Sequence, residues 1–281
     1  MLRLLTLTSA LALSAAAATA EDIKVGVSPG EHAEIMEEVA KVAAPKGLNI
    51  EVVEFSDYVV PNQALNDGDI DANSFQHRPY LENQIKDRGF ELVEVGTTIT
   101  TPMGVYSDKI TDIADLADGA KVGIPNDPTN GGRALLLLQQ QGLIKLAEDT
   151  GLVPTPLDVT ENAKNLTFLE LDAAQLPRSL ADTDISVINT NYALASGLNP
   201  NIDAIATEQD SPYVNIIVVK DGNQDQPWVK QLVEAYHSPE IKEPSLKIPK
   251  LGQNGVAAEI SKDPISLLRV KKLSELPSAT P

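Results

Sequence analysis

The stretch IKVGVSPGEHAEIMEEVAKVAAPKGLNIEVVEF, residues 23–55, predicts the fold. Residues 23–27 alternate between apolar and polar as a strand does, and residues 50–55 form a second strand. Between them, apolar side chains recur at helical spacing over residues 31–44. A strand, a helix and a strand at this separation form a βαβ unit. The two strands are therefore predicted to be parallel neighbours with a right-handed crossover.

The same alternation continues along most of the chain. Further helices are expected at residues 61–66, 79–88, 132–141, 173–180 and 227–236, and strands at residues 69–72, 92–95, 121–124, 167–171, 185–188 and 212–219. Residues 97–106 are interpreted as a hinge strand that leaves the first half, and residues 212–219 as a strand that crosses back. The sequence thus predicts an α/β protein with two doubly wound lobes that close around a ligand. Lobe 1 comprises residues 21–103 and 212–238, and lobe 2 residues 104–211.

Composition restricts the class of partner. The chain has 281 residues, 42% of them hydrophobic, a formal net charge of −18 and no cysteine. Nucleic acid and anionic membrane surfaces are disfavoured, because phosphate contacts need an excess of Lys and Arg. Disulfides, thiolate metal sites and a cysteine nucleophile are excluded for this sequence. A small neutral or zwitterionic ligand remains compatible with such a surface.

The first twenty residues have the pattern of a secretory signal peptide. Arg3 provides a positive charge, residues 4–18 are apolar, and Ala18-Thr19-Ala20 is a small-x-small cleavage site before Glu21. No later stretch reaches the roughly 20 apolar residues of a membrane span. The mature protein is expected to be exported, to begin near Glu21 and to be soluble.

The stretch DANSFQHRPYL, residues 71–81, is interpreted as a polar loop between a strand and a helix. Its aromatic and hydrogen-bonding side chains favour a ligand contact. Acting as a base, His77 would need an acid or nucleophile nearby; as a metal ligand it would need two further donors. His32 and His237 are far away in sequence, and no metal-binding spacing occurs. A hydrogen-bonding or stacking wall beside Phe75 and Tyr80 is therefore the favoured interpretation of His77.

A second stretch, PNDPTNGGR at residues 125–133, runs from a strand into a helix. Asp and Thr there can cap the helix, and the glycines could let backbone N–H groups approach a ligand. A helix N-terminus favours an anion, and Arg133 can form a bidentate pair with a carboxylate. The alternative is a capped helix with a solvated arginine. The lysine and spacing of a phosphate-binding loop are absent.

Three further side chains are candidates because they lie at or inside predicted strands. Asn189 follows an apolar strand at its carboxyl end, where ligands of α/β proteins collect. Asn215 lies within the apolar stretch that crosses back and needs a partner when buried, either a ligand or a loop carbonyl. Tyr58 follows another strand, and its alternative is ordinary core packing.

Seven segments together resemble one family. They are residues 52–58, 71–81, 125–138, 161–166, 174–180, 187–190 and 211–215. In this order they closely resemble the NlpA-type methionine-binding lipoproteins, the substrate-binding components of methionine ABC importers. The resemblance covers roughly residues 23–238 and implies a type II-like periplasmic-binding-protein fold with L-methionine in the interlobe cleft.

The resemblance also implies roles for the candidate residues. Arg133 would pair with the ligand carboxylate, and Asn189 and Asn215 would hold the amino-acid head group. Tyr58, Phe75, His77 and Tyr80 would form the pocket wall. The implied partners are the permease and ATPase subunits of an importer, with the binding protein as a monomer. No cofactor, metal or catalytic residue is expected.

Two departures from the family are visible. Its members are usually anchored through a lipidated cysteine, which this sequence lacks, so a freely diffusing periplasmic protein is expected. Pro244 and Pro249 also interrupt the closing helix of the family, and residues 239–281 are interpreted as a divergent or frame-disrupted tail. Alternatives to L-methionine are D-methionine, a methionine dipeptide or another apolar amino acid, with Asn73 and Ser74 tuning the pocket. An enzyme with His77 as base is a less favoured alternative.

Overall fold

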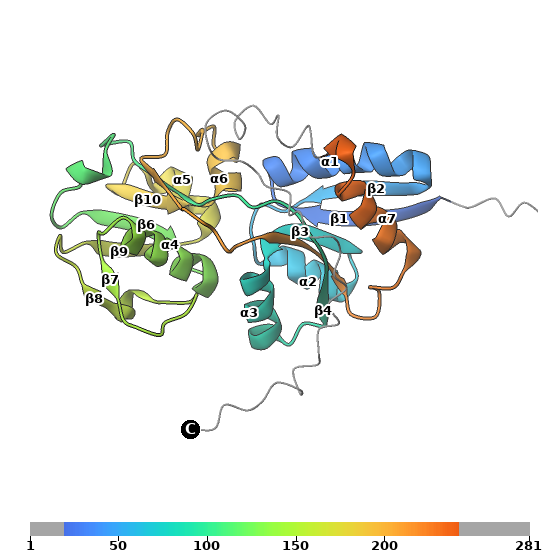
Figure 1. Cartoon of the computed structure of the whole chain (residues 1–281), viewed down its shortest axis with the longest axis horizontal. Helices are drawn as coiled ribbons and strands as arrows, with labels where there is room; N and C mark the ends of the chain where they lie inside the picture. Colours follow the sequence, from blue (N-terminus) through green and yellow to red (C-terminus); the bar gives the residue numbers. More distant parts are fainter. Residues whose placement is uncertain (1–19, 242–281) are drawn as a thin grey trace, which may run out of the picture.

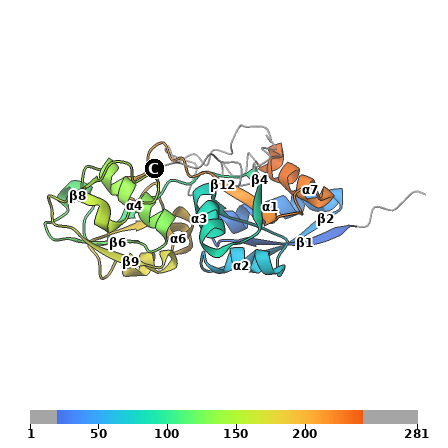
Figure 2. The same ribbon diagram turned by 90° about the horizontal axis from the view of Figure 1, so that it is seen from below.

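The computed structural model describes residues 20–241, which form two lobes side by side along the long axis of the molecule (Figures 1 and 2). Each lobe is built around one five-stranded sheet. The predicted two-lobed α/β fold is confirmed. The predicted signal peptide and the tail lie outside the described residues, apart from Ala20 and residues 239–241.

The sheet of lobe 1 has the strand order β2-β1-β3-β12-β4. Its strands are β1 (Glu21–Val27), β2 (Leu48–Glu54), β3 (Ala72–His77), β4 (Leu92–Thr97) and β12 (Asn215–Lys220). β1 pairs in parallel with β2 and with β3, as the βαβ pattern predicted. The returning strand β12 lies between β3 and β4 and is antiparallel to both. The last strand among residues 20–241 is therefore part of the first lobe.

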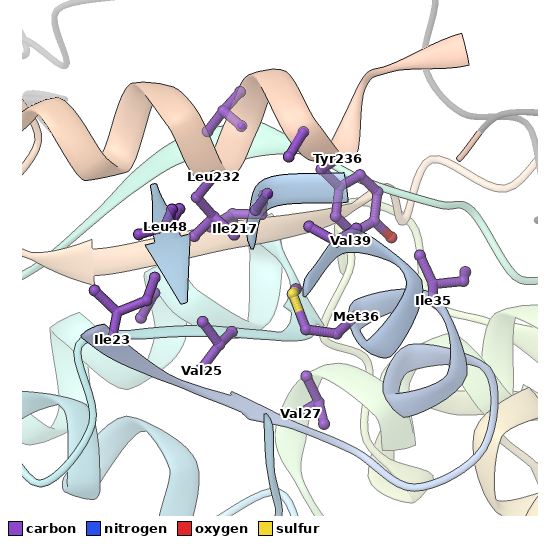
Figure 3. Packing of buried hydrophobic residues seen from close by; sticks show 14 of the residues in the cluster. Ile23, Val25, Val27, Ile35, Met36, Val39, Leu48, Ile217, Leu232 and Tyr236 are labelled. Atoms are coloured by element: carbon purple, nitrogen blue, oxygen red, sulfur yellow. The ribbon is translucent and has the colours of Figure 1, made fainter. Parts of the chain in front are cut away.

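Helices cover both faces of this sheet. They are α1 (Glu31–Ala43), α2 (Val60–Asp67), α3 (Arg78–Arg88) and α7 (Pro227–Tyr236), with a 3₁₀ turn at Ala44–Lys46. Successive side chains of a strand point to opposite faces. Ile217 of β12 accordingly joins the cluster under α1 and α7, together with Met36 and Leu232 (Figure 3). Ile216 packs on the other face with α2 and α3.

The sheet of lobe 2 has the order β11-β5-β10-β6-β9. The strands are β5 (Gly104–Tyr106), β6 (Lys121–Pro125), β9 (Thr167–Leu171), β10 (Ile185–Ile188) and β11 (Ala206–Thr207), with a small ribbon of β7 (Lys145–Leu146) and β8 (Val159–Glu161). The helices are α4 (Pro128–Gln140), α5 (Leu176–Ser179) and α6 (Thr190–Ala195), with 3₁₀ turns at Ile113–Asp115, Pro156–Asp158 and Ala173–Gln175. β9, β6 and β10 are parallel, β5 is antiparallel to β10, and β11 is antiparallel to β5.

The chain passes between the lobes twice, at residues 98–103 and 208–214. Glu208 N of the second crossing donates to Met103 O of the first at 2.9 Å, and Asn215 N, at the start of β12, donates to Ile99 O at 2.9 Å. The two crossings therefore form a paired connection. The lobe boundaries at residues 103/104 and 211/212 remain our proposal.

The prediction of a polar loop at residues 71–81 is wrong, because residues 72–77 form the fully buried strand β3. The polar side chains are tolerated there because they satisfy one another. Asn62 Nδ2 donates to Gln76 Oε1 at 2.8 Å, Asn73 Nδ2 donates to Asn62 Oδ1 at 3.0 Å, and Gln76 Nε2 donates to both asparagines. A closed amide network of this kind makes a buried polar strand stable.

The predicted helix over residues 173–180 is shorter than expected. It consists of a 3₁₀ turn followed by the four-residue helix α5, which has Pro177 in its first turn. α4 begins four residues earlier than predicted. Its start at Pro128 follows from Asp127, whose side chain accepts a hydrogen bond from Asn130 N as an N-cap.

Two titratable residues are buried at the start of α1. Glu31 is 1% exposed, and neither carboxylate oxygen has a hydrogen-bond partner among the described residues. Burial raises the pKa of Glu31 to about 8, with a further contribution from the nearby Glu34. Burial lowers the pKa of His32 to about 4. The folded protein therefore favours the protonated form of Glu31 at neutral pH.

Replacing Glu31 by Gln tests this burial. The folded protein binds the Glu31 proton more tightly than the unfolded chain does. The stability that this proton gives to wild type is fully present at pH values below the pKa of an ordinary carboxyl group. It is lost as the pH rises through about 8. At about pH 9 the free energy of unfolding of Glu31→Gln should therefore exceed that of wild type by on the order of a few kcal/mol, measured as a higher urea midpoint. Near pH 5 the two proteins should unfold at similar urea concentrations.

Glu37→Gln is the matched control, because Glu37 is exposed on the same helix and does not contribute to the raised pKa of Glu31. That variant should differ little from wild type at either pH. A Glu31→Gln effect of the same size at both pH values would contradict the assignment of a buried carboxyl proton.

Candidate functional site

One cavity is lined by both lobes and by the crossing segments. Its lining residues are His32, Tyr58, Phe75, Gln76, His77, Tyr80, Thr101, Met103, Asn130, Arg133, Asn189, Thr190, Asn191 and Asn215. The empty space between these side chains, including the open mouth, is about 380 Å³. All seven residues predicted from the sequence meet here, although they span 158 positions from Tyr58 to Asn215 inclusive.

Lobe 1 contributes an aromatic wall. The ring centroids of Tyr58, Phe75 and Tyr80 lie 6.0–6.2 Å from one another in tilted and edge-on arrangements. Tyr80 Oη donates to the backbone carbonyl of Tyr58 at 2.8 Å, which holds the two rings together. Tilted and edge-on aromatic pairs are mutually favourable. The cavity therefore has an aromatic wall formed by β3, α3 and the connection between β2 and α2.

The hydrogen bonds of His77 determine its tautomer. His77 is the N-cap of α3, and its Nδ1 accepts a hydrogen bond from Tyr80 N at 3.2 Å. Nε2 must then carry the proton, which it directs to Asn130 Oδ1 at 3.3 Å. Burial, followed by the charge of Arg133, lowers the pKa of His77 to about 3. This neutral ring positions its neighbours and is poorly suited to act as a general base.

Asn130 was not predicted as a site residue, yet it joins the two lobes. Its Oδ1 accepts from His77 of lobe 1 and, at 2.9 Å, from Asn189 Nδ2 of lobe 2. Its Nδ2 donates to both oxygens of Asp127. The sequence signal was present in the Asp127-Pro128-Thr129-Asn130 capping motif, but capping alone explained that motif.

The glycines at the start of α4 were predicted to let backbone N–H groups approach a ligand, and the structure gives them another role. A Cβ on Gly131 would meet the carbonyl oxygen of Pro125 at 2.7 Å, and one on Gly132 would meet the backbone of residues 152 and 153 at 2.8 Å. These glycines allow close packing of backbone on backbone. The Asp127 carboxylate already caps the helix N-terminus, where an external anion was expected.

Arg133 is buried, which excludes the solvated alternative. Its fork binds a protein carboxylate: Nη2 donates to Glu208 Oε2 at 2.6 Å, and Nε donates to Glu208 Oε1 at 3.1 Å. Nη2 also donates to Thr101 O at 2.8 Å, and the guanidinium carbon lies 4.4 Å from the centre of the Tyr213 ring. Nη1 is the guanidinium nitrogen with no hydrogen bond to a described residue. The bidentate pair expected for a ligand is thus made with Glu208.

Three asparagine side chains keep polar atoms directed at the cavity. Asn189 Oδ1 and Asn191 Nδ2 are buried without a hydrogen-bond partner among residues 20–241. The side-chain amide of Asn215 makes no hydrogen bond to a described residue, which argues against pairing with a loop carbonyl. Asn191 was missed, although it follows Asn189 by two positions after the same buried strand. The acceptor Asn189 Oδ1 and the donor Asn191 Nδ2 can therefore make hydrogen bonds to a polar ligand.

The lobes touch around the cavity. Tyr58 Oη donates to Asn191 Oδ1 at 2.5 Å, so this tyrosine has a polar role across the cleft besides its packing. Tyr192 Oη donates to Ser56 O at 3.3 Å, and its ring centroid lies 4.9 Å from that of Tyr58. Together with the His77–Asn130 contact, these bonds join the two walls of the site.

Within residues 20–241, no group of three or more His, Cys, Asp or Glu side chains is placed to hold a metal ion. In the same part of the chain, no helix has the length and apolar character needed to cross a bilayer. The chemistry of the cavity therefore comes from one guanidinium, several amides and aromatic rings.

Comparisons with known proteins agree with this geometry. The profile of the NlpA lipoprotein family matches residues 23–255. The D-methionine-binding lipoprotein MetQ of Salmonella typhimurium is 55% identical over 230 residues, covering 80% of this chain and 85% of the relative. MetQ of Escherichia coli K12 is 54% identical over the same shares of both chains.

Solved structures are equally similar. A nutrient-binding protein from Burkholderia cenocepacia bound to methionine has a TM-score of 0.78 and 56% identity, covering 80% of this chain and 95% of the other. A crystal structure of the methionine-binding protein MetQ has a TM-score of 0.79 and 54% identity over 80% and 94% of the two chains. The family match spans most of the sequence, including every candidate site residue, and the chain belongs to the NlpA lipoprotein family.

Proposed function

We propose that this protein captures L-methionine between its lobes and delivers it, as a monomeric substrate-binding subunit, to the membrane permease and ATPase of an ABC importer. The observation that carries the proposal is one cavity with an aromatic wall on one side and a buried guanidinium with unpaired amides on the other. Methionine has a thioether for the first and a zwitterionic head group for the second.

The site divides the ligand between its walls. The carboxylate is assigned to Arg133 Nη1, the ammonium to Asn189 Oδ1, and a further hydrogen bond to Asn215. The thioether lies against Tyr58, Phe75 and Tyr80, where sulfur–aromatic contacts contribute about 0.3–1.5 kcal/mol. Burial of the side chain contributes roughly 1.5–3 kcal/mol, so the charged head group supplies much of the affinity.

Binding is favoured over catalysis by the state of His77. Both ring nitrogens make hydrogen bonds to the protein, and the low pKa of about 3 makes the ring a weak base. The family to which the chain belongs consists of transport proteins. D-Methionine is the second candidate ligand, favoured by the names of the MetQ relatives.

Titration calorimetry with the two enantiomers tests the ligand. The carboxylate, the ammonium and the side chain contact three different walls, so exchange of two substituents at Cα misplaces one of them. We expect L-methionine to bind to protein refolded from guanidinium, and D-methionine to bind at least about tenfold more weakly, a difference of about 1.4 kcal/mol. Norleucine, which lacks sulfur, is the control ligand. If neither enantiomer gives binding heat, the proposal is overturned. If D-methionine binds more tightly than L-methionine, D-methionine is the ligand.

Asn189→Ala and Asn215→Ala test the head-group contacts. Hydrogen bonds to charged groups contribute about 1.5–3 kcal/mol each, so each variant should weaken methionine binding roughly 10- to 100-fold in the same titration. Arg133→Ala is a less clear test, because it leaves Glu208 buried and unpaired, which can cost about 3–5 kcal/mol of stability.

Asn126→Ala is the matched control, since Asn126 is exposed and does not line the cavity. It should bind methionine as wild type does. Wild-type affinity in both cavity variants would remove these asparagines from the site.

We also propose export to the periplasm as a freely diffusing protein. The whole chain should be expressed in a Gram-negative bacterium and the periplasm released by osmotic shock. Mass spectrometry should then find a protein whose mass corresponds to a chain that begins at Glu21, because the small residues Ala18 and Ala20 precede that position. The control is Leu11→Arg with Leu13→Arg, which breaks the apolar run and should retain the precursor in the cell. Recovery of the wild-type protein in the membrane pellet would contradict free diffusion.

A further inference from the structure

Glu208 is partly buried beside the cavity and has no role in the function proposed above. Its side chain is 9% exposed and that of Arg133 is 5% exposed. Both Glu208 oxygens accept from Arg133, at 3.1 Å and 3.2 Å from Nε and at 2.6 Å from Nη2. Oε2 also accepts from Met103 N at 3.3 Å. Glu208 is thus held by the guanidinium and by the backbone of the first crossing segment.

The surroundings of Arg133 leave its orientation little freedom. Nη2 reaches Thr101 O in the first crossing segment and Ser211 Oγ, at 3.3 Å, in the second. The Tyr213 ring supports the face of the guanidinium. With Nε and Nη2 occupied, Nη1 is the guanidinium nitrogen that makes no hydrogen bond within residues 20–241. Glu208 therefore determines which edge of the guanidinium the ligand encounters.

We propose that Glu208 is a positioning residue that sets the charge selectivity of the site, so that a zwitterionic amino acid binds in preference to the corresponding anion. The inference rests on the proposed methionine-binding function and extends it to the ligand class. An isolated buried guanidinium would attract any carboxylate. Paired with Glu208, Arg133 offers directed hydrogen bonds without a net positive charge.

The histidines and the aspartate near the cavity add no positive charge to that of the Arg133–Glu208 pair. Burial lowers the pKa of both lining histidines, His32 to about 4 and His77 to about 3, so both are neutral at pH 7. Asp127 does not line the cavity, and its oxygens accept hydrogen bonds from Thr129 and Asn130 at the start of α4. A ligand carboxylate therefore approaches a neutral ion pair, and a ligand ammonium beside it offsets the repulsion from Glu208.

A rival role for Glu208 is that of an internal substitute for the ligand carboxylate, displaced when methionine binds. Displacement would leave a buried carboxylate with one backbone hydrogen bond at 3.3 Å, which is unfavourable. The two roles predict opposite effects of removing the charge. If Glu208 competes with the ligand, Glu208→Gln should bind methionine more tightly.

The test compares methionine with its 2-hydroxy analogue, 2-hydroxy-4-(methylthio)butanoate, which lacks the ammonium and is an anion at neutral pH. Both are titrated calorimetrically into wild type and Glu208→Gln. Wild type should prefer methionine strongly, and Glu208→Gln should reduce the ratio of the two affinities by at least about tenfold. Glu208→Asp keeps the charge and should keep most of the ratio, even where the shorter side chain weakens both ligands.

Asp210→Asn is the matched control, because it removes one negative charge from an exposed residue two positions away. The φ of Asp210 is 51°, which Asn also adopts. Its affinity ratio should equal that of wild type.

An unchanged ratio in folded Glu208→Gln, or tighter methionine binding without a change in ratio, would overturn the inference. If Glu208→Gln does not fold, wild type still decides: equal affinity for both compounds overturns the inference, and preference for methionine with the ratio kept in Glu208→Asp supports it. Wild type that binds neither compound would overturn the proposed function itself.

Discussion

The buried guanidinium of Arg133 connects lobe 2 to both crossing segments. It starts from α4 in lobe 2 and reaches Thr101 in one crossing segment and Glu208 and Ser211 in the other. Burying a charge is unfavourable unless it is paired and hydrogen-bonded. Satisfying this one cation therefore constrains both connections between the lobes and places a polar group at the back of the cavity.

The lobes provide the rigid frame for this arrangement. β12 lies between β3 and β4, so the chain must return from lobe 2 to complete the sheet of lobe 1. Asn215 begins that strand beside His77 of β3. Phe75 and His77 lie in β3, Tyr80 and Arg133 in α3 and α4, and Asn189 and Asn215 at the ends of packed elements. Sites on such elements hold their geometry more closely than sites on loops.

Much of the site was predictable because its residue types are unusual for their surroundings. Phe75, His77 and Tyr80 form a dense polar–aromatic group, and Asn189 and Asn215 are amides beside apolar strands. Asn130 and Glu208 were missed for a different reason. Each is a common polar residue in a turn-rich segment, and its importance depends on a partner far away in sequence, His77 for Asn130 and Arg133 for Glu208.

By itself the sequence determined the α/β alternation, the parallel pair at the start, the returning strand and the family. These follow from local periodicity and from ordered motifs, which need no long-range geometry. Only the tertiary structure decided that residues 72–77 form a buried strand, since their amides are satisfied by Asn62 on another element. It also decided that the Arg133 fork binds Glu208. The physical reason is the same in both cases: a buried polar group is stable only with its partner, and the partner is chosen by the fold.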